Sequence, residues 1–343
     1  METKETLRNQ TIDAIKGFTI ILVVLAHAIQ RNIIDSESNI INCLINSFHM
    51  HLFMFLSGYL IAQSISKPRY KWLFKRFVRL ILPFFVWSII MYYMRSFDFS
   101  GLIYFGDAFK DGIIHSLINC FLFPWISLWF LYVLFMFYAL LLILQIIEKK
   151  IGMIIYVIVF LLLQFIPFSP FAAFGLYQAR WLCMFFFGGY LISIHKDKIP
   201  NINLIYKLVI IFSFPLLFII YRYFKLAPMW FYPWPISPTN AMFLTFRYLL
   251  AWSGVAATWL TISSICNTNI LRPLSYIGLF TLDIYAIHLM VLRLGIGEEW
   301  LMVLTVTVFA LAISLIVSWL IRRSKILTLI FFGQYDWNSN KLM

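Results

Sequence analysis

The chain has 343 residues, of which 62% are hydrophobic, 19% are aromatic and only 12% are charged. Soluble globular proteins contain roughly 45–50% apolar and about 25% charged residues, so this chain has too few charges to cover a soluble fold. Soluble enzymes, disordered tails and disulfide-rich extracellular scaffolds are thereby excluded. The apolar runs continue over about 20 residues, whereas strands of a membrane barrel alternate over about 10. The sequence therefore predicts an all-α polytopic membrane protein.

The net charge of +13 would indicate nucleic-acid binding in a soluble chain. Here the basic residues lie between apolar runs, so membrane topology and anionic lipid explain them better, and no nucleic-acid partner is expected. The four cysteines stand singly, without a C-x-x-C pair, which indicates small buried residues and disfavours a metal or disulfide framework. They are Cys43, Cys120, Cys183 and Cys266.

Apolar runs that match the length of a bilayer, about 20 residues, predict about ten transmembrane helices. Their ranges are 12–32, 40–63, 75–94, 127–147, 151–167, 180–195, 207–224, 241–264, 274–294 and 300–321. A shorter apolar piece over 112–126 is typical of a re-entrant or interfacial segment. The predicted organisation is a single transmembrane domain over 1–343, without a separate soluble domain.

The distribution of Lys and Arg supports this arrangement. With a cytoplasmic N-terminus, 19 basic residues lie inside and 8 outside, and the bias alternates correctly at every loop. Both termini are therefore predicted to be cytoplasmic. An alternative is that the first run, which ends in Ala26-His27-Ala28, is a cleaved signal peptide. Cleavage would remove one span and break the alternation, so the uncleaved form is favoured.

Ionisable side chains inside spans are informative, because an Asp, Lys or Arg at a helix centre costs at least about 2.5–3.5 kcal/mol. In the first span Asp13 and Lys16 lie three residues apart on one face and can pair. His27 lies roughly 21 Å beyond Asp13 along a straight helix. Asp13 therefore cannot orient His27 directly.

The ninth span carries Thr281, Tyr285 and His288 at spacings that align them as one polar stripe. His288 lies at a depth in its span similar to that of His27 in the first span. Two histidines at one depth on separate helices can line one cavity. Asp283, the one acidic residue deep in a predicted span, is expected to point elsewhere.

The second span adds His49 and His51 in the run NSFHMHLFMFLSGYL. Any one of these histidines is compatible with a hydrogen bond between helices. Together with His27 and His288 they favour chemistry, because imidazole, with an unperturbed pKa near 6.5, transfers protons at neutral pH. Zinc binding by the four is the alternative; without clear carboxylate or thiol ligands it is disfavoured, and no metal is predicted.

Two further segments have two interpretations each. The basic run KPRYKWLFKRFVRL before the third span is explained either by lipid headgroups and topology or by a cytoplasmic site for a phosphorylated ligand. The aromatic and proline-rich segment 225–240 is explained either by an interfacial belt or by a platform that stacks on sugars. Spacing alone leaves both pairs open.

In chain order, these segments resemble the acyltransferase family 3 membrane proteins, particularly their fucose 4-O-acetylase-like branch. The resemblance is carried by TIDAIKGFTIILVVLAHA, SFHMHLFMFLSGYL, KRFVRLILPFF, LWFLYVL, FFFGGYLI and LSYIGLFTLDIYAIHL, which lie between residues 11 and 290. Two positions depart from the family pattern. Lys16 stands where Arg is commoner, and His51 replaces a usual proline, which could reshape the acceptor side.

The resemblance implies an integral-membrane O-acetyltransferase that moves an acetyl group from acetyl-CoA to a hydroxyl of a cell-surface or lipid-linked carbohydrate, such as O-antigen, capsule or exopolysaccharide. It implies a multi-pass protein of the bacterial inner membrane that has acetyl-CoA as co-substrate and no cofactor. Its implied partners are acyl-CoA, the carbohydrate acceptor and membrane lipid. Two alternatives are a multi-span transporter or flippase of a glycan or small polar solute, and a structural subunit of a glycan-assembly complex.

The resemblance also assigns roles residue by residue. It matches His27 to the family's essential histidine, and Tyr285 and His288, which match the ninth-span motif, are expected to be catalytic with it. The residues expected to bind acyl-CoA are Asp13, Lys16, Lys75, Arg76 and Arg79. The residues expected on the acceptor side are His49, His51, Ser57, Trp129 and Arg180.

The expected chemistry begins when neutral His27 accepts the proton of a sugar hydroxyl whose oxygen attacks the thioester. The resulting oxyanion needs a hydrogen-bond donor, and the candidates are Tyr285, His288 and His49. The thioester is already activated, so the reaction requires no metal. A relay through an acyl-imidazole on His27 is the alternative path, and the sequence leaves both open.

Overall fold

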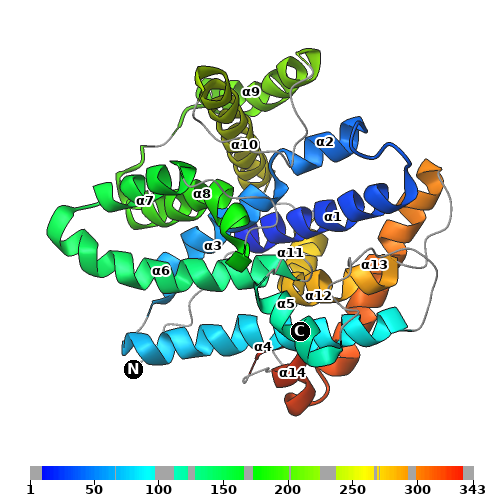
Figure 1. Cartoon of the computed structure of the whole chain (residues 1–343). Helices are drawn as coiled ribbons and strands as arrows, with labels where there is room; N and C mark the ends of the chain where they lie inside the picture. Colours follow the sequence, from blue (N-terminus) through cyan, green and yellow to red (C-terminus); the bar gives the residue numbers. More distant parts are fainter. Residues whose placement is uncertain are drawn as a thin grey trace.

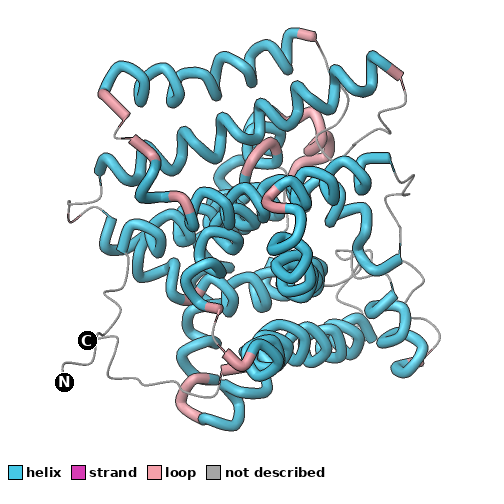
Figure 2. The backbone as a smooth tube through the Cα atoms, turned by 90° about the vertical axis from the view of Figure 1, so that its left-hand side faces the viewer, coloured by secondary structure: helices cyan, strands magenta, loops and turns pink. Residues whose placement is uncertain are grey.

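The computed structural model describes residues 10–65, 67–96, 112–122, 128–165, 173–200, 202–224, 237–265, 269, 271–292 and 299–334. The regular elements in these ranges are helices, with no strand among them, which confirms the predicted all-α class. Helix α1 (Gln10–Asn32) runs through the middle of the molecule, with α4 and α6 on one side and α9 and α10 on the other (Figure 1). Figure 2 shows the same helices from the side.

Each segment predicted to span the membrane is helical over most of its length. Eight of the ten coincide with one helix each: α1 (Gln10–Asn32), α4 (Arg69–Ser96), α6 (Trp129–Ile151), α7 (Ile154–Phe165), α8 (Leu176–Ile194), α9 (Leu204–Tyr223), α10 (Pro238–Ile265) and α13 (Trp300–Ile321). The shorter elements are α5 (Ile113–Leu122), which lies in the predicted interfacial segment, α14 (Lys325–Phe332), and the turns η3 (Ala173–Gly175) and η4 (Lys196–Lys198).

Among the described residues, six helical segments are long and apolar enough to cross a membrane, namely α1, Ile40–Ser64, α6, α9, α10 and α13, and a bent pair at Leu271–Val291 is a seventh candidate. The chain is therefore a multi-pass membrane protein. Helix α7 has 12 residues; it rises about 18 Å, less than the roughly 30 Å of a bilayer core. The number of ten spans and the cytoplasmic placement of both termini stay predictions, and the two ends of the chain lie outside the described residues.

The outward faces of α9 and α13 are covered by apolar side chains. Of α9, only Phe218 and Tyr221 are buried, while Phe212 is 66% exposed. On α13, Leu301 and Val308 are exposed to 73% and 66%. A continuous apolar face of this kind is costly in water but matches hydrocarbon. These two helices therefore face lipid.

Two predicted spans are broken, which the sequence analysis did not foresee. The second consists of α2 (Ile40–Asn46) and α3 (His49–Ser64), and the ninth of α11 (Leu271–Leu279) and α12 (Thr281–Val291), which are bent by 81°. At the break between α11 and α12, the Thr281 hydroxyl donates to the Gly278 carbonyl at 2.7 Å, and the Phe280 N–H donates to the Ile277 carbonyl at 3.0 Å. The last carbonyls of α11 are thus satisfied locally, without a continuing helix.

Reciprocal pairs of glycines bring two pairs of helices into backbone contact. Where α1 crosses α11, a Cβ on Gly17 would lie 1.8 Å from the Leu274 carbonyl oxygen, and a Cβ on Gly278 would lie 1.8 Å from that of Asp13. Gly58 on α3 and Gly189 on α8 form a second crossing of the same kind. Only residues without a side chain permit such an approach, which replaces hydrophobic contact as the source of helix association in lipid.

The α3–α8 crossing is expected to be sensitive to one methyl group. In Gly58→Ala the new Cβ would lie 1.9 Å from the Phe186 carbonyl oxygen, so the helices must separate and the free energy of unfolding should fall by at least about 2 kcal/mol. Thermal unfolding of the detergent-purified variants measures this. Ser264→Ala, at an exposed position of α10, is the control; an unchanged melting temperature for Gly58→Ala would contradict the close crossing.

Candidate active site

A cavity of about 500 Å³ lies between α1, α3, α4, α6 and the break between α11 and α12. Its volume is in the range of roughly 300–1,000 Å³ found for small-molecule sites. Much of its wall is apolar and includes Phe53 and Phe130. Its polar lining consists of Asp13, Lys16, Ser57, Ser64, Arg76, Arg79, Tyr138, Thr281, Tyr285 and Gln334.

Arg76 is held by two aromatic rings. Its guanidinium carbon lies 5.3 Å from the ring centre of Trp72 and 5.9 Å from that of Tyr138. The Trp72 indole N–H donates to the Ser64 carbonyl at 2.7 Å, which ties the start of α4 to the end of α3. Contacts with ring faces restrict the arginine and leave its N–H groups for a ligand.

Two further cations, Lys16 and Arg79, line the cavity with Arg76. As predicted, Lys16 pairs with Asp13, with 3.3 Å between Nζ and Oδ1. Asp13 is the one carboxylate in the described lining, so three positive charges face one negative charge. This excess suits a ligand that carries phosphate groups. Lys75, which was predicted to join them, is exposed on α4 and does not line the cavity.

Tyr285 connects the cavity with a pair of histidines. Its hydroxyl oxygen accepts the Phe130 N–H at 3.4 Å, so the phenolic proton can be donated elsewhere. Its ring centre lies 6.0 Å from that of His288, which lies 5.5 Å from that of His27. The two histidines predicted to share a depth are thus neighbours, although they belong to α12 and α1.

Hydrogen bonds to carbonyl groups determine which nitrogen of two buried imidazoles carries the proton. His288 Nδ1 lies 2.9 Å from the Ile284 carbonyl oxygen, and His49 Nδ1 lies 2.8 Å from that of Ile45. Because a carbonyl only accepts, Nδ1 is the donor, and Nε2 of the neutral ring carries a lone pair. Neutral His288 and His49 therefore cannot donate to an oxyanion through Nε2, as the sequence had suggested. Tyr285 remains the candidate donor.

His27 is oriented by a side chain one turn further along α1. Its Nδ1 lies 2.9 Å from Gln30 Oε1. When Nδ1–H donates to this amide oxygen, Nε2 keeps the lone pair that a general base needs. His288 is completely buried, whereas part of the His27 surface stays exposed. His27 is thus a partly exposed imidazole packed against a buried one, and neither ring is part of the cavity lining.

Comparison with known proteins assigns the chain to a family. The profile of acyltransferase family 3, described as an acyltransferase domain, matches residues 9–323. The chain belongs to this family. Over 103 residues it is also 35% identical to Nodulation protein NolL of Sinorhizobium fredii (strain NBRC 101917 / NGR234), a segment that covers only 28% of this chain and 28% of that protein. No solved structure matches the chain significantly.

In this member of the family the residues predicted for the acceptor side lie in more than one place. Ser57 lines the cavity beside the cations. His51 is buried, with its ring centre 5.0 Å from that of Trp181, which lies 6.1 Å from that of Trp129. Arg180, the neighbour of Trp181 on α8, is 1% exposed. His51, Trp181 and Trp129 form an aromatic cluster outside the cavity lining.

The described part of the chain holds no group of three or more His, Cys, Asp and Glu side chains that could bind a metal ion. The pair of His27 and His288 accordingly has no third ligand of these types within those residues. The described cysteines are buried free thiols, namely Cys43, Cys120 and Cys183. Cys266 lies outside the described residues.

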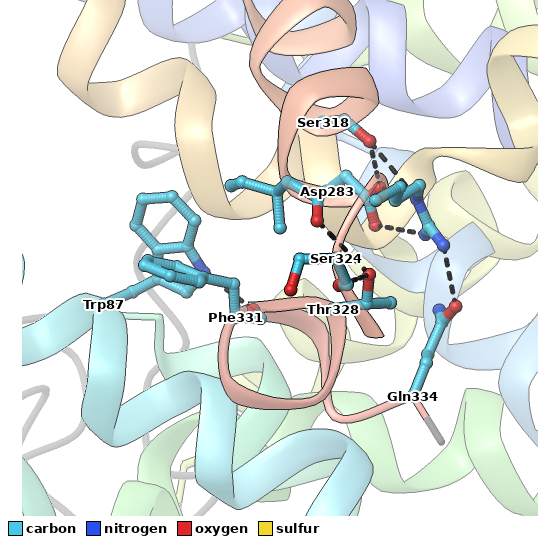
Figure 3. Close-up of polar contacts among 9 residues, drawn as sticks. Trp87, Asp283, Ser318, Ser324, Thr328, Phe331 and Gln334 are labelled. Atoms are coloured by element: carbon cyan, nitrogen blue, oxygen red, sulfur yellow. Dashed lines mark hydrogen bonds and ion pairs between the residues drawn. The ribbon is translucent and has the colours of Figure 1, made fainter. Parts of the chain in front are cut away.

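The partner of Asp283 is not predictable from the sequence. Arg322 donates through Nε and Nη2 to the two carboxylate oxygens at 2.7 and 2.9 Å, and the Ser318 hydroxyl donates to the same carboxylate (Figure 3). Asp283 is completely buried and Arg322 is 8% exposed. A single carboxylate deep in a span signals that a cation must lie nearby. Arg322 had been explained by topology alone, because nothing in the sequence links positions so far apart.

The effects on stability of substituting Asp283 and Arg322 are expected to be strongly non-additive. Asp283→Ala leaves Arg322 without its counter-charge and should lower the free energy of unfolding by about 3–5 kcal/mol. The double variant Asp283→Leu, Arg322→Met removes both charges and should be more stable than either variant with one of these changes. Thermal unfolding in detergent measures the coupling, and strictly additive losses would contradict it.

Proposed function

We propose that this acyltransferase is an O-acetyltransferase that moves an acetyl group from acetyl-CoA to a hydroxyl of a cell-surface or lipid-linked carbohydrate. The observation that carries the proposal is the order of groups along the site. The cations of the cavity are followed by Tyr285, which contacts His288, which contacts His27. A thioester anchored by phosphates at the cationic end would extend its acyl group towards these histidines.

In the proposed complex, Lys16, Arg76 and Arg79 bind the phosphates of the donor. Guanidinium groups bind phosphate through pairs of N–H donors, and Arg76 is already oriented by its aromatic neighbours. The apolar wall at Phe53 and Phe130 then accommodates the pantetheine arm. Binding energy from the nucleotide end, remote from the reacting carbon, helps to position the thioester.

His27 is the general base of the proposed reaction. Its Nε2 takes the proton of the acceptor hydroxyl while that oxygen forms a bond to the thioester carbonyl carbon. The carbonyl oxygen becomes an oxyanion and accepts a hydrogen bond from the Tyr285 hydroxyl. When the tetrahedral intermediate collapses, the C–S bond breaks and the His27 imidazolium gives its proton to the sulfur. The products are an O-acetyl ester and the CoA thiol.

A relay through His27 is the alternative path. Nε2 attacks the thioester carbon, CoA leaves as the thiolate, and the acceptor hydroxyl then attacks the acyl-imidazolium. The thiolate takes up the proton that the hydroxyl loses. An experiment without acceptor distinguishes the two paths, because only the relay then accumulates acetylated His27. Incubation with labelled acetyl-CoA followed by rapid quenching would trap this species.

The acceptor side of the proposed site is the aromatic cluster of His51, Trp129 and Trp181, together with His49 and the buried Arg180. Aromatic rings offer apolar faces to sugar rings, and the buried arginine offers donors to hydroxyl groups. We place the protein in the bacterial inner membrane, where cytoplasmic acyl-CoA and a lipid-linked glycan both reach a multi-pass enzyme.

The proposed base is tested by His27→Ala, for which we expect acetyl transfer to fall at least about 100-fold. Membranes with equal amounts of each variant are incubated with CoA that carries a labelled acetyl group. Alkali-labile label is then counted in extracted lipid-linked glycan. His195→Ala is the matched control, because His195 Nδ1 also bonds a carbonyl, that of Leu191 at 3.0 Å, but does not line the cavity. Equal labelling by wild type and His27→Ala would remove His27 from the reaction.

The proposed oxyanion donor is tested by Tyr285→Phe, which keeps the ring beside Phe130 and removes the hydroxyl. We expect kcat to fall about 10²–10³-fold while KM for acetyl-CoA changes little, because the donor acts on the transition state. Tyr276→Phe, at a half-exposed position of α11, is the control. A rise in KM without a fall in kcat would assign Tyr285 to substrate binding instead.

A further inference from the structure

We infer that Gln334 belongs to the donor site and that its amide nitrogen donates hydrogen bonds to a phosphate of the acyl donor. Gln334 lines the same cavity as Lys16, Arg76 and Arg79. It lies beyond residues 9–323, which the family profile matches. The identity of the ligand rests on the proposed function, whereas the placement and orientation of the amide come from contacts within this chain.

The turn that carries Gln334 is fixed to α4. The Trp87 indole N–H donates to the Phe331 carbonyl at 2.9 Å, at the end of α14 (Figure 3). Gly333 has a φ of +63°, and a Cβ there would lie 2.3 Å from the Val78 carbonyl oxygen. The chain after α14 therefore packs directly on the α4 backbone, at the turn that carries Arg79.

Arg322 determines which end of the Gln334 amide is available. Its Nη1 donates to Gln334 Oε1 at 2.9 Å, and its Nε and Nη2 donate to the buried Asp283 (Figure 3). A guanidinium only donates, so Oε1 is the bonded acceptor, and Nε2 retains two N–H donors. Within the part of the chain that the structure describes, the contact with Arg322 is the only hydrogen bond of this side chain. The ion pair thus acts as a positioning device for the amide.

The chemistry of the neighbouring side chains selects the ligand. Three cations and one carboxylate line the cavity, and a neutral amide adds directed donors without adding charge. Phosphate oxygens accept several hydrogen bonds at once and are favoured by the surrounding positive charge. A cationic ligand would meet N–H groups and repulsive charges. Gln334 therefore contributes to the affinity for a phosphate-bearing donor and not to the acyl-transfer step.

Binding of CoA itself tests this assignment, because CoA carries the phosphates but has no acyl group to transfer. We expect the Kd of the detergent-purified protein to rise at least about tenfold in Gln334→Ala and further in Gln334→Glu. The glutamate keeps an oxygen for Arg322, so a purely structural role predicts that Gln334→Glu binds CoA like wild type. Gln63→Ala is the matched control, an exposed amide on α3 outside the cavity lining, and should leave the Kd unchanged.

A second readout separates donor affinity from catalysis. In the transfer assay Gln334→Glu should raise KM for acetyl-CoA and leave kcat/KM unchanged for the acetyl thioester of N-acetylcysteamine, which lacks the phosphates. Equal losses with both donors, wild-type CoA affinity in Gln334→Glu, or no CoA binding by wild type would each overturn the assignment. CoA binding that depends on Gln334, without any acetyl transfer by wild type, would support it while overturning the proposed function.

Discussion

The backbones of α1 and α11 touch at Gly17 and Gly278, and the other parts of the candidate site take their positions from this contact. It brings Lys16, one residue before the crossing, next to the 81° break between α11 and α12. His27 and His288 each follow the glycine of their own segment by ten residues, and their rings meet. A side chain at either glycine would force the helices apart and would move the cation and the base together. A small change in the packing of α1 against α11 would therefore displace both the cationic end of the site and the histidine pair.

Burial in a bilayer makes every unpaired polar group costly, and this cost explains how the functional side chains are held. In each of these side chains, one of the two polar atoms is hydrogen-bonded within the protein: His27 Nδ1 to Gln30, His288 Nδ1 to a backbone carbonyl, and Gln334 Oε1 to Arg322. The hydrogen-bonded atom determines the orientation of the side chain and, for the histidines, the tautomer. The second polar atom offers a lone pair in the histidines and two N–H donors in Gln334. These are the groups with which the proposed site would engage a hydroxyl and a phosphate.

The sequence predicts the features that depend on local pattern. The range 12–32 lies within α1 because a continuous apolar run has no alternative but a helix in lipid, and equal depth identified His27 and His288 as neighbours. The break at Phe280 was not predictable, since it depends on a hydroxyl bond and on the close approach of a second helix. The partner of Asp283 lies 39 residues away, so no spacing rule finds it. Gln334 follows a helix of eight residues that is too short to give a periodic signal.

Continuity between the cationic cavity and the histidine pair is tested most directly by photolabelling. A CoA thioester whose acyl group carries a diazirine is bound to the purified protein and irradiated, and the modified residues are identified by mass spectrometry. The proposed site predicts label on α12 around Tyr285 and His288 or on α1 around His27, and it predicts that excess CoA prevents the labelling. Label confined to the lipid-facing helices α9 and α13, or label that CoA does not displace, would show that the donor does not reach the histidines.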